Sequence, residues 1–472
     1  MSSPEQPRGQ NSRTRKMMES ANGETDETSG LTTPRSHEVP LCSSYENGIT
    51  RIPEEIRLGD PEAYHPKAVC IGPYFHSARN SPSFRRMEQH KRWCVNRLLE
   101  RSSHSLEPLV QAFLLRLSKA IKTKSFLQLY SGPVDMTEEE IGMMLLFDGC
   151  FIVHFLLRHD PNKGAEHEYW TKLDAGLLDH DYGTHQWERP WEWSLVAIDM
   201  LLLENQIPFV AVRILFDILK TEHDEAVDLT ACARSMFNKY LPAGMRTSTR
   251  PIRCHDARCL LQLLYRSLLP NPKLRSDLME PPPRPPRTGI EPAKKLDADG
   301  VSITRRRRRR WWWPLSHFQE PFTFLDIAFS HGKLQIPQLE VSDASIQLLQ
   351  NLIAFEKCYE GATTCHVANY AAFMDALNAD HHDTEMLRRR RVLDVRSTSP
   401  QHEVSLRRRC KQDVDPSSEN YLGRVMVDVV LYREARASRR KTQTTPMSDT
   451  MFFVVLAVTA YVFLALCWYI VS

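Results

Sequence analysis

Apolar residues recur every three or four positions in several long stretches of this chain. They do so in residues 83–102, 137–158, 194–219, 256–270, 344–359 and 367–379. This spacing places the apolar side chains on one face of a helix. The sequence therefore predicts a mainly α fold.

The stretch 137–158 has a well-marked beginning. Thr137 is a candidate N-cap, and Glu138, Glu139 and Glu140 follow it in the first turn, where negative charge is favourable. The apolar run behind them is interrupted by Asp148 and His154 and is short for a membrane span. We expect a helix that is buried in the protein core.

The stretch 194–219 contains Pro208, which cannot occupy the middle of an uninterrupted helix. We therefore expect two helices, with Asn205 and Gln206 in the turn between them and Pro208 opening the second. The amide side chains of Asn205 and Gln206 would satisfy backbone groups that the break leaves free.

A different periodicity governs residues 324–343. Apolar and polar residues alternate there on both sides of Gly332, and β-branched residues recur. This pattern is typical of a small β-hairpin or an extended arm.

Residues 451–471 differ from every other apolar stretch, because none of them is charged. A core helix of this length would carry a polar stripe. At a rise of 1.5 Å per residue, 21 residues span about 31 Å, close to the roughly 30 Å of a bilayer core. Arg439, Arg440 and Lys441 precede the stretch. We expect one C-terminal transmembrane helix, with the N-terminal region in the cytoplasm according to the positive-inside rule.

These patterns divide the chain into six regions. The prediction is a helical, two-part globular region with a small β-hairpin, followed by the transmembrane helix. In order, we expect a disordered N-terminal tail (1–44), a helical first part (45–270), a linker rich in proline and arginine (271–314), a second part (315–440), a juxtamembrane stretch (441–450) and the transmembrane helix (451–471).

Six arginines and three tryptophans, Arg305 to Trp313, close the predicted linker. Such a run could bind phosphate and stack on bases, or serve as a nuclear address. A membrane anchor competes with a nuclear address, and a proline-rich linker presents no rigid surface. We therefore expect a solvated, tolerant segment, with contact to lipid headgroups or to a protein as the alternative.

Composition restricts the function classes further. The formal net charge is only +3, since 61 basic residues nearly balance 58 acidic ones, and this disfavours a dedicated nucleic-acid binder. Eleven cysteines without a regular framework, and polar residues 1–40 without an apolar signal, favour reduced thiols in a domain that faces the cytosol.

No motif in the sequence predicts catalytic, cofactor-binding or metal-binding residues. Phosphate-binding glycine loops, a nucleophile elbow and a zinc-binding histidine motif do not occur. Ligand-type residues do cluster, but without a second pair at zinc spacing; they are Cys254, His255, Asp256 and Cys259 in one cluster, and His381, His382 and Asp383 in the other. Asp199 and Glu204 are five residues apart, so they would lie on different faces of a helix. For them we expect capping or bridging of neighbouring helices.

Six blocks of this sequence, in this order, resemble the plant domain-of-unknown-function 247 family. They are "RIPEEIRLGDPEAYHPKAVCIGPYF", "MEQHKRWCVNRLLER", "LLFDGCFIVHFLL", "DMLLLENQIPF", "LDIAFSHGKLQIPQLEVSD" and "NLIAFEKC", and the resemblance covers roughly residues 45–470. It implies a C-terminal membrane helix and offers no catalytic residue to carry over. Some grass relatives are implicated in pollen–stigma self-incompatibility.

The chain departs from the family pattern at two places. Where relatives carry a block of the Ala/Thr-Glu-Leu…Ala-Gly-Val type before the hairpin, this chain has "VSITRRRRRRWWWPLSHF". Its C-terminal apolar stretch also lacks the aromatic-Asn-Pro-Trp entrance of many relatives. The arginine–tryptophan run therefore replaces a family block.

The functional expectation is a single-pass, membrane-anchored plant protein that is not an enzyme and needs no cofactor. It would act as a protein-interaction or recognition module at a membrane surface, with lipid around its C-terminal helix, an unidentified protein partner and no specific nucleic acid. Two alternatives are a self-incompatibility-type recognition determinant and an enzyme of unknown class. The sequence indicates neither which membrane carries the protein nor its oligomeric state.

Overall fold

The computed structural model describes ten stretches of the chain. They are residues 48–121, 125–162, 190–245, 247, 257–270, 289–307, 322–360, 365–396, 420–444 and 449–471. The predicted tail (1–44) lies outside them, as do Arg308 to Trp313 of the arginine–tryptophan run.

The first half of the described chain is helical. Its α-helices are α1 (Glu54–Arg57), α2 (Pro82–Ser102), α3 (Leu106–Ile121), α4 (Glu138–Leu157), α6 (Pro190–Asp199), α7 (Phe209–Leu219), α8 (Leu229–Tyr240) and α9 (Leu260–Leu268). Four short 3₁₀ helices accompany them, namely η1 (Pro61–Tyr64), η2 (His76–Asn80), η3 (Phe126–Leu129) and η4 (Glu222–Asp224). These elements confirm the mainly helical prediction for this half.

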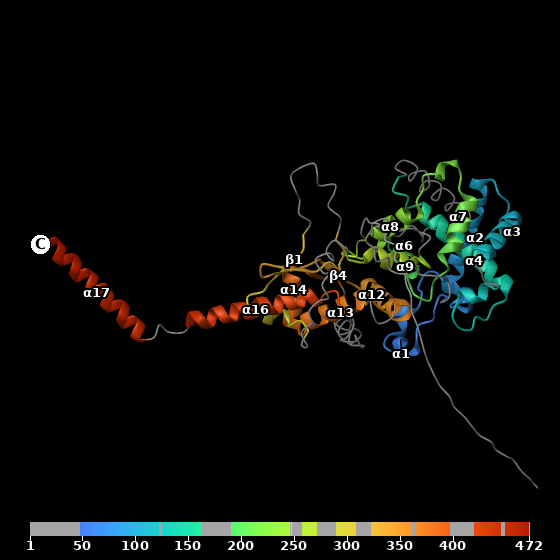
Figure 1. The fold of residues 1–472 in the computed structure, drawn as a ribbon. Helices are drawn as coiled ribbons and strands as arrows, with labels where there is room; N and C mark the ends of the chain where they lie inside the picture. Colours follow the sequence, from blue (N-terminus) through green and yellow to red (C-terminus); the bar gives the residue numbers. More distant parts are fainter. Residues whose placement is uncertain are drawn as a thin grey trace, which may run out of the picture. The chain divides into compact units, whose positions relative to one another are not determined.

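Helix α4 is the centre of the first half. It packs against α2, α3, α7 and α8, which lie around it (Figure 1). Its start is as predicted, because Thr137 accepts a hydrogen bond from the Glu140 backbone while the Glu140 carboxylate accepts one from the Thr137 backbone. From Ile141 to Leu157 nearly every side chain is buried. The prediction of a buried core helix is thus confirmed.

The second half combines helices with two small sheets. Its helices are α11 (Ala293–Ala298), α12 (Asp343–Phe355), the π-helical turn η7 (Glu356–Glu360), α13 (His366–Leu377), α14 (His381–Arg389), α16 (Gly423–Thr444) and α17 (Asp449–Val471). Strands β1 (Ser302–Arg305), β3 (Lys333–Ile336) and β2 (Ala328–Ser330) form one sheet in that order, and β4 (Leu339–Val341) pairs with β5 (Leu393–Val395) in the other.

The predicted hairpin is present as β2 and β3, which pair antiparallel with Ser330 opposite Lys333. The two residues of its turn, His331 and Gly332, both have positive φ (50° and 74°), as a two-residue hairpin turn of type I′ requires. The Tyr432 side chain of α16 lies so close to Gly332 that any Cβ there would clash with it.

The predicted linker 271–314 is wrong in its second half. Helix α11 and strand β1 lie inside this range, and β1 pairs in parallel with β3 from Ser302↔Lys333 to Arg305↔Ile336. Four apolar side chains attach them to the core, namely Ala293, Leu296, Val301 and Ile303. The prediction relied on the average composition of this range. Its many prolines and arginines outweighed the four apolar residues of this short pattern. Removing residues 281–310 would therefore remove part of the core.

The expectation of a solvated segment is wrong for Arg306, the second arginine of the run, whereas the Arg305 side chain is exposed. Arg305 belongs to β1, and the Arg306 backbone donates to the Ile336 carbonyl at 2.7 Å. The Arg306 guanidinium donates to the Asp326 carbonyl and lies 5.4 Å from the centre of the Phe322 ring. The run therefore begins as the continuation of a sheet strand.

The two predicted globular parts are not separate. Residues 43–472 form one unit, and one hydrophobic cluster extends from Ile49 to Val429. Helix α12 packs on both η1 and α9. The predicted division at 270 and 315 is thus not a domain boundary within the described residues.

Candidate functional site: a buried polar cluster

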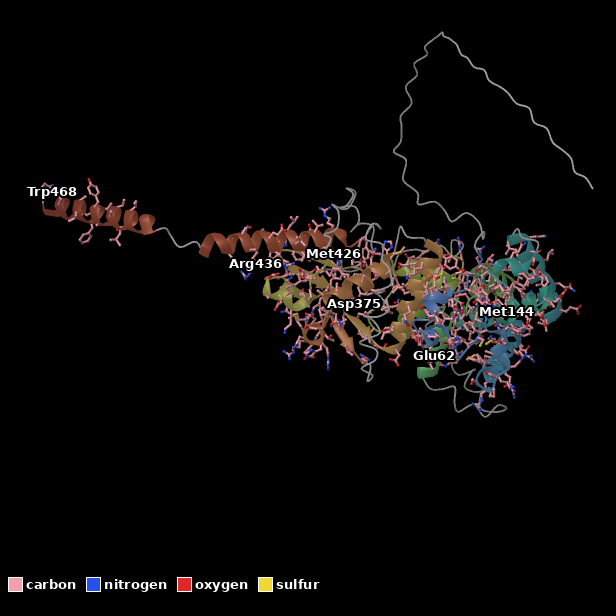
Figure 2. All side chains as sticks on the ribbon, turned by 90° about the horizontal axis from the view of Figure 1, so that it is seen from below. Glu62, Met144, Asp375, Met426, Arg436 and Trp468 are labelled. Carbon is pink, nitrogen blue, oxygen red and sulfur yellow. The ribbon has the colours of Figure 1, made fainter. Side chains whose placement is uncertain are left out.

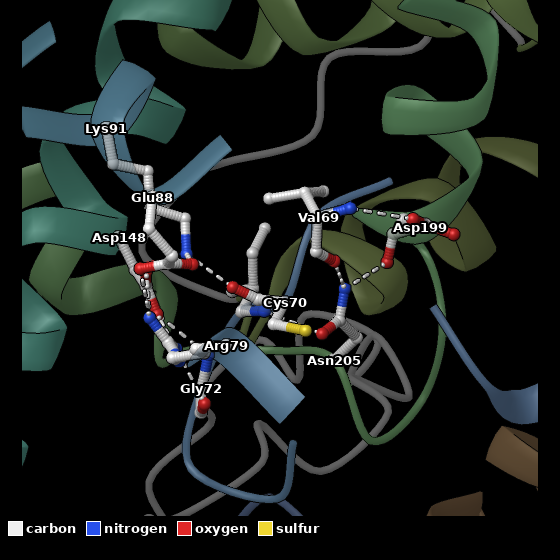
Figure 3. Close-up of polar contacts among 10 residues, drawn as sticks. Val69, Cys70, Gly72, Arg79, Glu88, Lys91, Asp148, Asp199 and Asn205 are labelled. Carbon is white, nitrogen blue, oxygen red and sulfur yellow. Dashed lines mark hydrogen bonds and ion pairs between the residues drawn. The ribbon is translucent and has the colours of Figure 1, made fainter. Parts of the chain in front are cut away.

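An extended segment, residues 67–72, crosses the interior of the protein and carries no regular hydrogen-bond ladder. We call it the central segment. Val69, Cys70 and Ile71 are fully buried, so their backbone groups need partners inside the protein. Asp199, Asn205 and Lys91 supply these partners, and Asp148 binds the next residue, Gly72. Figure 3 shows these side chains around the central segment.

Asp199, the last residue of α6, holds one end of the central segment. Its Oδ2 atom accepts hydrogen bonds from the backbone N–H groups of Lys67, Ala68 and Val69, at 2.9, 2.5 and 3.0 Å. Burial raises the pKa of the Asp199 carboxyl to about 7, and the three N–H donors oppose that rise. The expectation that Asp199 caps or bridges neighbouring helices is wrong in its partner, because Asp199 connects α6 to the non-helical central segment.

Asn205 and Gln206 lie in the turn between α6 and α7, as predicted from Pro208. Pro208 is the N-cap of α7. The Asn205 amide accepts from the Ile71 N–H (2.6 Å) and donates to the carbonyls of Val69 and Asp199. The Gln206 amide donates to the carbonyls of Met200 and Leu202 and accepts from the Leu261 N–H. Both amides therefore satisfy backbone groups around the break.

Asp148 of α4 holds the other end. It is fully buried and accepts from the Gly72 N–H (2.8 Å), from both terminal nitrogens of Arg79 (3.0 and 2.7 Å) and from Lys91 (2.7 Å). Burial disfavours its ionised form, but Arg79 and Lys91 outweigh burial and lower the pKa of its carboxyl. Asp148 is thus an anion in a dry site with two cations.

The two cations have further partners. The Lys91 ammonium donates to the Cys70 carbonyl and to Glu88 (2.6 Å), and Arg79 donates to the Gly72 carbonyl (2.8 Å). The charges of Asp148, Glu88, Arg79 and Lys91 balance, as expected for ions that are stable away from water. The sequence signal for this cluster was Asp148 itself, a lone acid in an apolar helix that required a cationic partner.

Two other buried carboxylates have similar tasks. Glu204 accepts from the Ile52 N–H (2.8 Å) and from Arg57 (2.5 Å). Glu356, in η7, accepts from the N–H groups of Val367 and Ala368 at the start of α13, and burial raises its pKa to about 7. Each binds the protein's own donors.

The second half of the chain also contacts the N-terminal segment. Asn351 of α12 donates to the Ala63 carbonyl (2.9 Å) and accepts from the Leu203 N–H (2.9 Å). The Tyr359 hydroxyl accepts from the Thr50 N–H (2.7 Å) and donates to the Gly48 carbonyl. Residues 48–75 are therefore held by side chains from α4, from the α6–α7 turn and from α12 with η7.

Imidazoles and aromatic rings pack beside α4. His90 is stacked on Trp93, with ring centres 5.2 Å apart, and lies edge-on to Phe151 at 6.2 Å; His154 lies edge-on to Trp93 at 5.3 Å. Burial, together with the nearby Arg158 charge, lowers the pKa of His90 to about 4. The imidazole is therefore neutral at pH 7.

A small pocket opens between α12, α13, β4 and β5. Its walls are mostly apolar, and they include Leu339, Leu349, Met374 and Leu393. Tyr370 also lines it, and the buried Tyr370 hydroxyl has no hydrogen-bond partner among the described residues. The pocket could admit a small apolar group, and Asp375 and Asn378 are further polar residues of its lining.

The ligand-type clusters of the sequence have ordinary positions where they are described. Asp383 caps the start of α14 by accepting from the Asp380 N–H, and it also accepts from the Lys294 N–H. Cys259 is buried at the start of α9. Cys254, His255 and Asp256 lie outside the described residues. Within the described part of the chain, no group of three or more potential metal ligands is found.

Apart from Arg79, the residues of the buried cluster come from the sequence blocks on which the family resemblance rests. A comparison with protein families decides the assignment, since the profile of plant proteins of unknown function called DUF247 matches residues 49–467. The chain belongs to the DUF247 family.

The comparison with curated proteins adds one relative. The UPF0481 protein At3g47200 of Arabidopsis thaliana is 25% identical over 368 residues, which cover 76% of this chain and 70% of that protein. No solved structure matches the chain. The DUF247 assignment thus confirms the resemblance.

Proposed function

We propose that this DUF247 protein is a membrane-anchored module that binds another protein at a membrane surface and does not turn over a substrate. The observation that carries the anchor is the exposure of α17. Its described large apolar side chains are at least half exposed, as at Leu456 (54%), Tyr461 (75%) and Trp468 (78%). An apolar helix without a protein partner is stabilised when lipid surrounds it.

The length of α17 fits this role. Its 23 residues span about 34 Å at 1.5 Å per residue, enough to cross a bilayer core. Among fully described residues, its apolar stretch runs from Leu456 to Leu466. Helix α4 is also long and apolar enough for a span, but 83% of its apolar window is buried inside the protein. This contrast favours α17 over α4 as the proposed anchor.

The buried cluster supports binding over catalysis. Asp148, Asp199, Glu204 and Glu356 are the acids that could serve an acid–base reaction, and backbone or side-chain donors of this chain engage each of them. A catalytic acid or base needs hydrogen-bond reach to a substrate. In this interpretation the family blocks encode a rigid scaffold, and recognition belongs to its surface.

The orientation and the partner can be tested together in plant cells. With the N-terminal region in the cytoplasm, protease added to intact microsomes should digest it without detergent. A labelling enzyme fused to the N-terminus should then mark neighbours that a protein lacking residues 451–472 does not mark. Protection of the N-terminal region until detergent is added would overturn the topology. A purified chain that turns over a substrate, in a manner abolished by one polar substitution, would overturn the binding role.

A further inference from the structure

Helix α16 has a stripe of side chains that changes its chemistry along the helix. Leu422, just before the helix, and Met426, Val429, Arg433 and Arg436 are spaced alternately by four and three residues, and Arg440 continues this spacing. Such spacing keeps side chains on one face of a helix. We call this face the α16 stripe.

The first part of the stripe is docked on the domain. Leu422, Met426 and Val429 are buried, and α16 packs against β2. Tyr432, beside the stripe, meets the Phe329 ring edge-on at 5.7 Å. This part of the helix is therefore fixed by ordinary core packing.

Arg433 marks the end of the docked part. Its guanidinium forms an ion pair with Asp299 and lies 3.8 Å from Glu291. One turn later Arg436 lies over Gly300, where a Cβ would collide with the guanidinium. These contacts hold the direction in which α16 leaves the domain.

Beyond this point the same face is exposed and basic. All side chains from Glu434 to Arg440 are exposed, and Figure 2 shows Arg436 further along α16 than the docked Met426. Arg439 follows Arg436 by three positions and directly precedes Arg440. It therefore lies beside both of them on the helix surface. No acidic residue occurs between Glu434 and Asp449. The exposed part of the stripe is thus a concentrated positive charge.

We propose that Arg436, Arg439 and Arg440 bind the anionic headgroups of the leaflet through which α17 inserts. This inference rests on the proposed membrane anchor. Helix α17 begins five residues after α16 ends, so the stripe is tethered within a few residues of the headgroup layer. A helix face that is apolar where it meets protein and arginine-rich where it leaves protein matches a surface that carries phosphates. The domain would then be held at a defined orientation above the membrane.

The test uses the full chain in lipid nanodiscs of two compositions, phosphatidylcholine alone or mixed with phosphatidylserine. Hydrogen exchange of residues 434–444 is measured in both. Each arginine near an anionic surface contributes roughly a fivefold preference, so we expect exchange to slow at least about tenfold in the anionic discs. High salt should reverse the slowing, because it screens the headgroup charge.

A triple variant, Arg436→Gln, Arg439→Gln and Arg440→Gln, should exchange at the same rate in both kinds of disc. Its matched control is Arg388→Gln, Arg389→Gln and Arg391→Gln, which removes three exposed arginines at the end of α14 and should keep the slowing. Equal exchange of the native chain in both discs, or equal loss of the slowing in the control, would overturn the proposal.

Failure of the anchor is distinguishable from failure of the stripe. A chain that does not co-purify with neutral discs overturns the anchor and, with it, the headgroup site. A chain that inserts into both kinds of disc but shows no difference in exchange overturns the stripe alone. Slowing by an added polyglutamate peptide in neutral discs, without slowing by phosphatidylserine, would make the stripe a protein-binding surface and would contradict the lipid proposal.

Discussion

Helices α4 and α17 are similar in length and both strongly apolar, yet α4 is buried in the protein and α17 is exposed. Helix α4 has 20 residues, an acid and an imidazole among its buried side chains, and neighbours on all sides. Helix α17 has 23 residues, no charged residue after Asp449, and exposed apolar side chains. Mean apolarity does not separate the buried helix from the exposed one. What distinguishes the buried helix is that it carries polar side chains with partners in the protein.

The largest effect is expected when the buried carboxylate of α4 is removed. Asp148→Ala removes the buried carboxylate from Arg79 and Lys91, which keep only the partly exposed Glu88, and it leaves the Gly72 N–H without its acceptor. Loss of one member of a buried ion cluster costs about 3–5 kcal/mol. We expect a matching fall in the free energy of unfolding, measured by urea denaturation. The control Glu88→Gln changes the partly exposed member of the same cluster and should cost far less. Equal losses would contradict a central role for Asp148.

The next prediction introduces a charge into the other helix. Ala460→Arg puts an arginine near the middle of α17, where it should disfavour insertion by about 2.5–3.5 kcal/mol. We expect a larger fraction of the protein to be extracted from membranes by alkaline carbonate, with no change in domain stability. Ala460→Leu is the matched control and should remain membrane-bound. If Ala460→Arg lowers the stability of the domain, α17 packs on protein and the contrast with α4 fails.

The imidazoles beside α4 predict a response to pH. The pKa of His90 is about 4 in the folded protein and about 6.5 when unfolded, so this residue contributes stability above pH 6.5 that is lost as the pH falls toward 4. Between pH 7 and 5 the loss amounts to about 2 kcal/mol. We expect His90→Gln to lose correspondingly less stability than the native chain over this range, as followed by urea denaturation at each pH.

Asp199 supplies a control of opposite sign. Its folded pKa of about 7 lies above the ordinary value of 3.8, so its contribution is fully present below pH 3.8 and is lost as the pH rises toward 7. Acidification increases the stability contribution of Asp199, and Asp199→Asn should abolish this increase. Acidification decreases the stability contribution of His90, and His90→Gln should abolish this decrease. Changes of the same sign in both variants would contradict this assignment.

The smallest effect concerns the start of α4. Thr137→Ala removes the side-chain acceptor of the capping box, which typically costs about 1 kcal/mol. We expect a small drop in the urea midpoint without a change in membrane extraction. Thr137→Ser keeps the acceptor and should be nearly neutral. A large effect of Thr137→Ala would show that the start of α4 is held by more than its cap.

Local sequence signals predicted the elements that have local causes. The cap at Thr137, the break at Pro208 and the hairpin around Gly332 each depend on residues within a few positions of one another, and all are present. The mainly helical architecture follows from periodicity in the same way. The family was also recognisable from ordered blocks.

The remaining features depend on contacts between distant residues. Strand β1 has four residues, and its partner β3 begins 31 positions later, so composition assigned β1 to a linker. Asp148 finds its cations 57 and 69 positions earlier in the chain. Nothing near Arg79 or Lys91 in the sequence marks them as buried. The sequence indicates that Asp148 requires a buried cationic partner, but it does not indicate which residues supply it.

The way residues 48–75 are held has a consequence for synthesis. Thr50 and Ala63 receive their partners from Tyr359 and Asn351, which lie 309 and 288 positions later. At about 5–20 residues per second, a ribosome needs roughly 15–60 s to produce the intervening chain. During that time the first ordered segment of the nascent protein has none of these late partners. A chaperone that binds extended apolar chain would have this interval in which to act.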